Sequence, residues 1–123
     1  MGAHRKKLYI ICIHDEWGLS HSQFTKLKSA IGMHQPDYWE FFNPGTISIF
    51  FKDTKKGSNK ASSLMKTLQD IKNDKSGLDK IGIGNSEGEM VFETNEWGKI
   101  LSTPLGGAAN EAIAKAKNMA TVS

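Results

Sequence analysis

An aspartate shortly after an apolar run is the first carboxylate of this chain, and a carboxylate is a ligand for hard metal ions. Asp15 comes after the run at residues 8–13, and Gly18 follows three positions later. A carboxylate oxygen beside the free backbone amides of a helix start can hold Mg²⁺ and a phosphate group at one point. The same Asp-x-x-Gly pattern is common in loops and helix caps, so it gains weight only together with other motifs.

A second group of glycines and polar residues lies in the second half of the chain. Residues 80–84 and 88–91 are glycine-bearing stretches with apolar residues, and Thr103, Gly106 and Asn110 come after them. Glycine at 106 and 107 is expected to open a helix. By itself, Asn110 is an ordinary polar residue in the first turn of that helix.

The elements that must position these residues follow from hydrophobic periodicity and from capping signals. Ser20 stands three residues before Gln23, which predicts a capping box, and Asn43-Pro44-Gly45 predicts a tight turn. Residues 85–88 are expected to form a turn between two strands. The expected strands are 7–14, 38–42, 46–51, 78–84, 89–94 and a short piece at 99–102; the expected helices run from Ser20 to Gly32, over 58–73, and from 106 onward.

This order predicts an α+β fold of ferredoxin-like type, an antiparallel sheet with helices on one face. A hairpin flanked by two crossover helices is typical of that fold, and right-handed crossovers place both helices on the same face. With 38% hydrophobic residues, positions 1–123 are expected to form one domain. The last helix presents Ala109, Ala112, Ile113 and Ala116 on one narrow face, which permits close approach to the sheet or to a second subunit.

Aromatic residues gather in the expected hairpin. Because one helical layer would leave the other sheet face bare, we expect this aromatic surface to form the interface of a homodimer. The alternative is that both aromatic rows are internal, one under helices and one under loops. The residues are Tyr38, Trp39, Phe41, Phe42, Phe50 and Phe51.

Composition and charge exclude several classes of protein. The net charge is +3, and the lysines are scattered among thirteen acidic residues, so no nucleic acid partner is expected. The apolar run at 8–13 is too short to cross a membrane and no secretory signal is evident, so we expect a cytoplasmic protein. Cys12 is expected to be a small buried hydrophobe, His14 to be packed or hydrogen-bonded, and the histidines lack a zinc spacing.

Taken together, these motifs resemble the catalytic domain of class III adenylate and guanylate cyclases, in a small and degenerate version. The segment from Asp15 to Ser20 matches the D-x-x-G-F-T pattern of that family. Residues 82–91 match its G-I-x-x-G-E-V pattern with two extra positions, and Asn110 matches the asparagine of its V-N-x-A-A-R pattern.

The resemblance implies roles for particular residues. It makes Asp15 a metal ligand, with Mg²⁺ or Mn²⁺ present when nucleotide is bound and no cofactor otherwise. It implies that Asn110 holds the ribose and that Thr103 contacts the purine. Glu40 falls at the base-selecting position, where guanylate cyclases carry glutamate. The implied nucleotide-binding residues are Trp17, Gly18, Glu40, Thr103, Gly106 and Asn110.

Departures from the family pattern fall on the catalytic positions. The second metal aspartate of the family is replaced by Asn43-Pro44, and its transition-state arginine by Ala114. Lys115 stands one position away, which is roughly a 100° rotation on a helix. Losing one of two metal-binding carboxylates should remove several kcal/mol of transition-state stabilisation.

The sequence therefore favours a stand-alone, dimeric cyclase-like domain that binds a purine nucleotide, with catalysis weak or lost. An active nucleotidyl cyclase is the first alternative, with an atypical metal site made by Asp15 together with Glu16, Asp37 or Glu40. The second alternative is a dimerisation or interaction module that binds no nucleotide.

Overall fold

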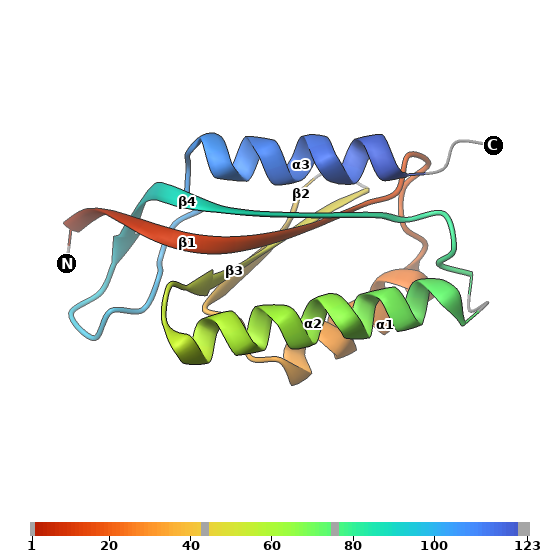
Figure 1. Ribbon diagram of the computed structural model, residues 1–123, viewed down its shortest axis with the longest axis horizontal. Coiled ribbons are helices and arrows are strands. Elements are labelled where there is room, and N and C mark those ends of the chain that lie inside the picture. Colours follow the sequence, from red (N-terminus) through yellow and green to blue (C-terminus); the bar gives the residue numbers. More distant parts are fainter. Residues whose placement is uncertain (1, 43–44, 75–76, 121–123) are drawn as a thin grey trace.

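The computed structural model describes residues 2–42, 45–74 and 77–120. Within these ranges the chain forms an antiparallel sheet of four strands and three helices (Figure 1). The α+β fold class is confirmed. In chain order the elements are β1 (Gly2–His14), α1 (His21–Met33), β2 (Tyr38–Phe42), β3 (Thr46–Lys52), α2 (Lys55–Asn73), β4 (Gly82–Thr94) and α3 (Gly107–Met119).

Strand β1 lies inside the sheet, whose strand order is β2-β3-β1-β4. This order is the ferredoxin-like one that the sequence predicts. β1 pairs with β3 from Leu8↔Lys52 to His14↔Thr46, and with β4 along the whole length of both strands. The end of β1 at His14 therefore lies between the start of β3 at Thr46 and the start of β4 at Gly82.

Helices cover both faces of the sheet (Figure 1). The crossover helices α1 and α2 share one face, as predicted, and α3 lies on the opposite face. Alternate side chains of β1 divide between the two resulting cores, because successive side chains of a strand point to opposite faces. The α1/α2 core includes Ile11, Ile13, Leu27, Ile49, Phe51, Leu64 and Leu68, and the α3 core includes Leu8, Ile10, Cys12, Phe50, Met90, Phe92 and Ala112.

The α3 face is thus not bare, which contradicts the expectation of an exposed aromatic surface. Two of the aromatics are fully buried on opposite faces, Phe50 with α3 and Phe51 with α1 and α2. Phe41 stacks on Phe24 of α1 at 4.6 Å between ring centroids. Tyr38, Trp39 and Phe42 are half-buried and Phe41 is 39% exposed. The second aromatic row is covered by helix α3 and not by loops, so it matches neither the interface nor the alternative stated for it.

Glycines let α3 lie directly on β4. A Cβ at Gly84 would come within 2.3 Å of the Ala112 carbonyl oxygen, and one at Gly82 within 1.8 Å of the Ala116 carbonyl oxygen. The small face predicted for the last helix is confirmed, since Ala112 and Ala116 are fully buried. This face packs on the sheet of its own chain.

The turn predicted at residues 85–88 is wrong, because these residues lie inside the single strand β4. Each of them pairs with β1, from Asn85↔Ile11 to Gly88↔Leu8. A thirteen-residue partner strand stabilises extended backbone here, despite the turn-forming composition. The short strand expected at 99–102 is reduced to an isolated bridge between Thr94 and Ile100.

β1 begins at Gly2, five residues before the expected strand 7–14, because its start pairs with the end of β4. β4 begins at Gly82, four residues after the start expected at 78. The remaining boundaries lie close to those predicted. The capping box at Ser20 and Gln23 is confirmed, with both reciprocal hydrogen bonds present. Helix α2 begins three residues earlier than expected, because the Thr54 side chain caps it by accepting from the Gly57 amide at 2.9 Å. The predicted turn residues 43 and 44 lie outside the described ranges. No helix in the described ranges is both long and apolar enough to cross a membrane.

Candidate functional site

Asp15 lies at the exit of β1 in a tight, largely buried turn. Its side chain accepts a hydrogen bond from the Trp17 amide at 2.9 Å, and its own amide donates to the Gly45 carbonyl at 2.8 Å. A Cβ at Gly45 would come within 2.2 Å of the Asp15 carbonyl oxygen, so this approach requires glycine. Gly18 takes a positive φ of 86°, which favours glycine, and Trp17 is 72% exposed. One carboxylate oxygen of Asp15 is therefore already engaged in shaping the turn.

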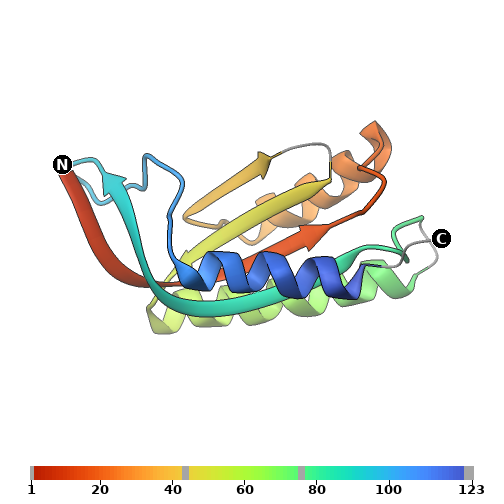
Figure 2. The same cartoon turned by 90° about the horizontal axis from the view of Figure 1, so that it is seen from above.

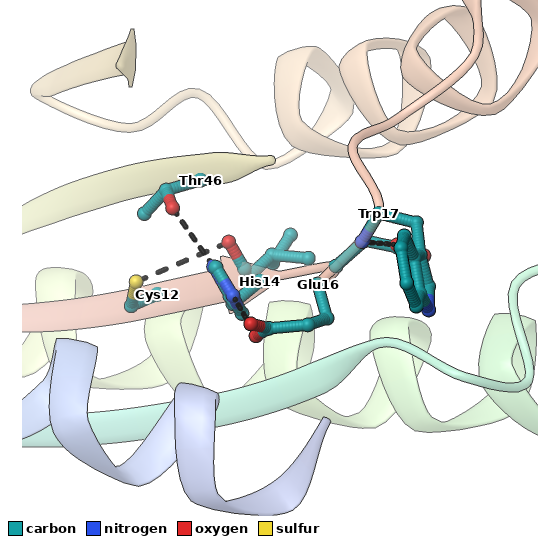
Figure 3. Close-up of polar contacts among 7 residues, drawn as sticks. Cys12, His14, Glu16, Trp17 and Thr46 are labelled. Carbon is teal, nitrogen blue, oxygen red and sulfur yellow. Dashed lines mark hydrogen bonds and ion pairs between the residues drawn. The ribbon is translucent and has the colours of Figure 1, made fainter. Parts of the chain in front are cut away.

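Next to this turn, His14 of β1 contacts β3 through one ring nitrogen and the turn after β1 through the other (Figure 3). Nδ1 lies 2.9 Å from the Thr46 hydroxyl oxygen, and Nε2 lies 3.0 Å from Oε2 of Glu16. Because a carboxylate only accepts, Nε2 carries a proton and donates to Glu16. In the neutral ring, Nδ1 then accepts from the Thr46 hydroxyl. The prediction that His14 is hydrogen-bonded is confirmed.

Two of the residues assigned to base recognition are in direct contact. The Thr103 hydroxyl donates a hydrogen bond to Oε2 of Glu40, across 63 positions of sequence. The Tyr38 hydroxyl oxygen lies 3.5 Å from the Thr103 hydroxyl oxygen. Both strand residues point to the α3 face, since Tyr38 packs in the α3 core and Glu40 is two positions on. These three half-buried side chains form a polar cluster, here called the Glu40 cluster.

The start of α3 provides the third part of the predicted site. Gly106 is the N-cap residue of this helix, and a Cβ there would come within 2.7 Å of the Glu89 carbonyl oxygen. Asn110 lies in the first turn, where its amide donates to the Gly106 carbonyl at 3.3 Å, and it is exposed. Gly106 therefore fixes where the helix begins, and Asn110 is open to solvent.

The structure brings some of these residues together and separates others. Ala108 of α3 lies beside Gly88, which pairs with Leu8, whereas Asp15 is seven positions further along β1. At roughly 3.3 Å per strand residue, the first turn of α3 and the Asp15 turn are about 20 Å apart. Within one chain, Asp15 with Trp17 and Gly18 form one part of the site, and Glu40 with Thr103 form another.

The described residues do not fit a centre for two metal ions. They contain no group of three or more His, Cys, Asp or Glu side chains placed to share an ion. The acids considered for an atypical site have separate partners, since Glu16 bonds His14, Glu40 bonds Thr103, and Asp37 accepts from the Lys52 amide at 2.8 Å. Of these acids, Asp15 therefore remains as the candidate metal ligand at the end of β1.

Cys12 lies on the α3 face between these parts. Burial raises the pKa of its thiol to about 11, although hydrogen bonding from Ser48 and the charge of Lys117 act in the opposite direction. The side chain is fully buried, so the expectation of a small buried hydrophobe is confirmed. A thiol that remains protonated at neutral pH is a poor nucleophile.

Comparison with solved structures supports the class of fold that this sheet and these helices define. A bacterial light-regulated adenylyl cyclase matches with a TM-score of 0.60 and 14% identity, over 95% of this chain and 40% of that one. The catalytic core of a rhodopsin-guanylyl cyclase with converted specificity, in complex with ATPαS, matches with a TM-score of 0.64 and 10% identity. This match covers 94% of this chain and 74% of that one. The guanylate cyclase domain of RhGC from Catenaria anguillulae, in complex with GTP, matches with a TM-score of 0.63 and 10% identity. This match covers 93% of this chain and 74% of that one.

The chain therefore has the fold of class III adenylyl and guanylyl cyclase catalytic domains. The resemblance noted in the sequence is confirmed at this level, as that of a small, divergent cyclase-like domain. The chain spans less than half the length of the bacterial light-regulated enzyme. No protein-family model and no curated protein sequence gives a match.

Sequence reasoning missed two features of the site. It did not include Tyr38, whose hydroxyl approaches Thr103, because aromatic residues in a strand are usually assigned to a core. It also did not pair His14 with Thr46 and Glu16. The spacing of His14 and Glu16, two apart at a strand end, is a signal for a same-face pair and was available.

Proposed function

We propose that this domain binds a purine nucleotide, with guanine preferred, and that its cyclase catalysis is weak or lost. The observation that carries the proposal is the hydrogen bond between Thr103 and Glu40. Both positions were assigned to base recognition from separate parts of the sequence, and their side chains meet on one face of the sheet.

The chemistry of this pair suits guanine. A carboxylate accepts hydrogen bonds, and guanine offers N–H donors on its Watson–Crick edge next to the O6 acceptor. The Glu40 carboxylate would accept from those donors, and the Thr103 hydroxyl would donate to O6. Adenine has an amino donor where guanine has O6, so it would not receive the threonine proton in this way. The two side chains satisfy each other until the base replaces their mutual bond.

Weak or absent catalysis follows from the acids that the site contains. Asp15 is the metal ligand implied by the family pattern, and one of its oxygens is occupied by the Trp17 amide. We propose that Mg²⁺ or Mn²⁺, when it accompanies a nucleotide, is held by Asp15 and the phosphates. Transition-state stabilisation by two carboxylate-bound ions would then be missing.

We further propose that the domain acts as a homodimer. α3 packs mainly on β4 and β1, so it does not extend over the part of the sheet that carries Glu40. The Asp15 turn and the first turn of α3 are also about 20 Å apart along β1 at roughly 3.3 Å per residue. A second copy on this face would bring the Asp15 turn of one chain toward the Asn110 side of the other.

The first test is thermal unfolding with GTP, ATP, CTP or UTP in the presence of Mg²⁺. GTP is expected to stabilise the protein most, by about 2.7 kcal/mol at a hundredfold excess over its dissociation constant. Glu40→Gln should weaken GTP binding about tenfold or more, because a hydrogen bond to a charged group is lost. Glu93→Gln, an exposed glutamate of β4, is the matched control and should bind GTP normally. If no nucleotide stabilises the protein, the interaction-module alternative is correct.

The second test separates binding from catalysis. The protein is incubated with labelled nucleotides and Mg²⁺ or Mn²⁺, and products are separated by chromatography. We expect binding without appreciable cyclic or oligomeric product. A metal-dependent product that disappears in Asp15→Ala would instead support the active-cyclase alternative.

A further inference from the structure

A cavity of about 500 Å³ lies on the α3 side of the sheet, at the end of the β1–β4 pair. Figure 2 shows β1 and β4 continuing beyond the start of α3, so the helix does not cover this end. The segment after β4 turns back along the sheet, and its turn at residues 95–98 forms the rim. The volume is in the range of small-molecule sites, and no residue of the Glu40 cluster lines the cavity.

Three lysines line this cavity, and two of them, Lys6 and Lys52, have no ion-pair partner among the described residues. Lys6 and Lys52 come from adjacent parts of β1 and β3 and face the same side as Leu8. The Lys52 ammonium lies next to the rim, 3.6 Å from where a Cβ of Gly98 would be. By contrast, Lys7 pairs with Glu87 at 3.5 Å.

In the described part of the chain, the acidic side chains of the lining form no ion pair with these two lysines. Asp53 hydrogen-bonds Tyr9, and this bond is the main reason why the pKa of Tyr9 is raised. Tyr9 belongs to the opposite, α2 face of the sheet, so Asp53 is engaged on that side. Glu96 is the other lining acid of the described chain, and it is exposed on the rim.

The floor of the cavity is apolar. Leu8 and Phe92 are 1% and 4% exposed and belong to the α3 core. The imidazole of His4 lies against the Phe92 ring, with 6.4 Å between centroids. An apolar floor below ammonium groups suits a ligand that has both an apolar body and an anionic head.

We propose that this cavity is a second binding site, for a small organic anion that carries a phosphate or carboxylate group on an aromatic or aliphatic body. Lys6 and Lys52 would bind the anionic oxygens, and the body would lie on Leu8 and Phe92. The site is independent of the proposed nucleotide function, because the two share no residue.

Phenyl phosphate is the probe, and backbone amide NMR of the full chain is the measurement. Saturable shifts are expected at the lining positions, among them Leu8, Lys52 and Phe92. Inorganic phosphate and benzyl alcohol carry only the head or only the body, and each should bind at least tenfold more weakly. Equal binding of inorganic phosphate would overturn the apolar part of the proposal, and shifts scattered over the surface would overturn the site.

Charge variants test the role of the lysines. The double variant Lys6→Gln with Lys52→Gln should weaken phenyl phosphate at least tenfold, since hydrogen bonds to charged groups are lost. Lys66→Gln, an exposed position of α2, is the matched control and should leave the affinity unchanged. Glu96→Gln removes the rim carboxylate and should tighten binding several-fold, which cannot result from misfolding. Unchanged affinity in the double variant, or weaker binding in Glu96→Gln, would contradict the proposal.

Discussion

Glu40 and Thr103 show at the level of single residues what the sequence supports and what only the fold provides. Their assignment to base recognition came from the family resemblance, and their direct hydrogen bond is a product of tertiary packing between β2 and the segment before α3. No local pattern predicts that contact, because periodicity reports on one element at a time. The hydrogen bonding of His14 and the burial of Cys12 were predictable, since both lie in or beside an apolar strand.

Cys12 should make stability depend on alkaline pH. Its thiol ionises near pH 9 in the unfolded chain and only near 11 when folded, so the unfolded state binds fewer protons between these values. The free energy of unfolding should therefore fall as pH rises through this window, by about 3 kcal/mol in total. Below pH 9 the thiol is protonated in both states and has no effect.

Urea unfolding of wild type and Cys12→Ala at several pH values measures how much the Cys12 thiol contributes to the pH dependence of stability. The variant should lose the part of the alkaline slope that comes from the thiol, although lysines and tyrosines still contribute. Identical slopes in the two proteins would show that Cys12 is not protected in the fold.

At the level of elements, the glycines of β4 account for the incorrect prediction of a turn at residues 85–88. Gly84 and Gly88, with polar residues between them, were interpreted as ends of a turn because such residues commonly form turns. In the structure, Gly84, like Gly82, lies where the backbone of α3 approaches β4 closely, and Gly88 lies beside Ala108. Glycine in a strand can mark close packing as well as a turn, and only the position of α3 decides between them.

This contact predicts a large difference between two glycine substitutions. Gly84→Ala should destabilise the protein by about 1–3 kcal/mol, since its Cβ would meet backbone atoms of Ala112 and Ala116. Gly107→Ala should be neutral or slightly stabilising, because no atom lies within 4 Å of the added methyl group and alanine favours a helix. Denaturant unfolding of both variants gives the comparison. Equal stability of the two variants would mean that α3 does not approach β4 so closely.

At the level of the whole molecule, the sequence predicts the fold class, but it does not predict that helices cover both faces of the sheet. The strand order and the positions of α1 and α2 follow from the crossover rule. The packing of α3 on its own sheet did not follow from the sequence, because a small-residue helix face suits a sheet or a second subunit equally well. The proposed homodimer now depends on the uncovered area beside Glu40 and not on a bare sheet.

Mixing two variants tests whether one nucleotide site uses both copies. Asp15→Ala and Glu40→Lys should each bind GTP weakly in the presence of Mn²⁺. If the site is shared, mixed dimers contain one site with both native residues, and tight binding should reappear in part of the population. Calorimetry measures the affinity and stoichiometry, and light scattering gives the mass. A mixture that binds no better than its components would mean that each site lies within one chain.

The central place of β1 has a consequence for synthesis of the protein. β1 precedes both of its neighbours in the sequence, and the later neighbour, β4, consists of residues 82–94. Until those residues emerge, the nascent chain carries an unpaired backbone edge next to Ile10 and Cys12, whose cover by α3 is also still missing. Open edges of this kind favour association between chains. Translational arrest before residue 82 would therefore leave the nascent protein at its most aggregation-prone stage.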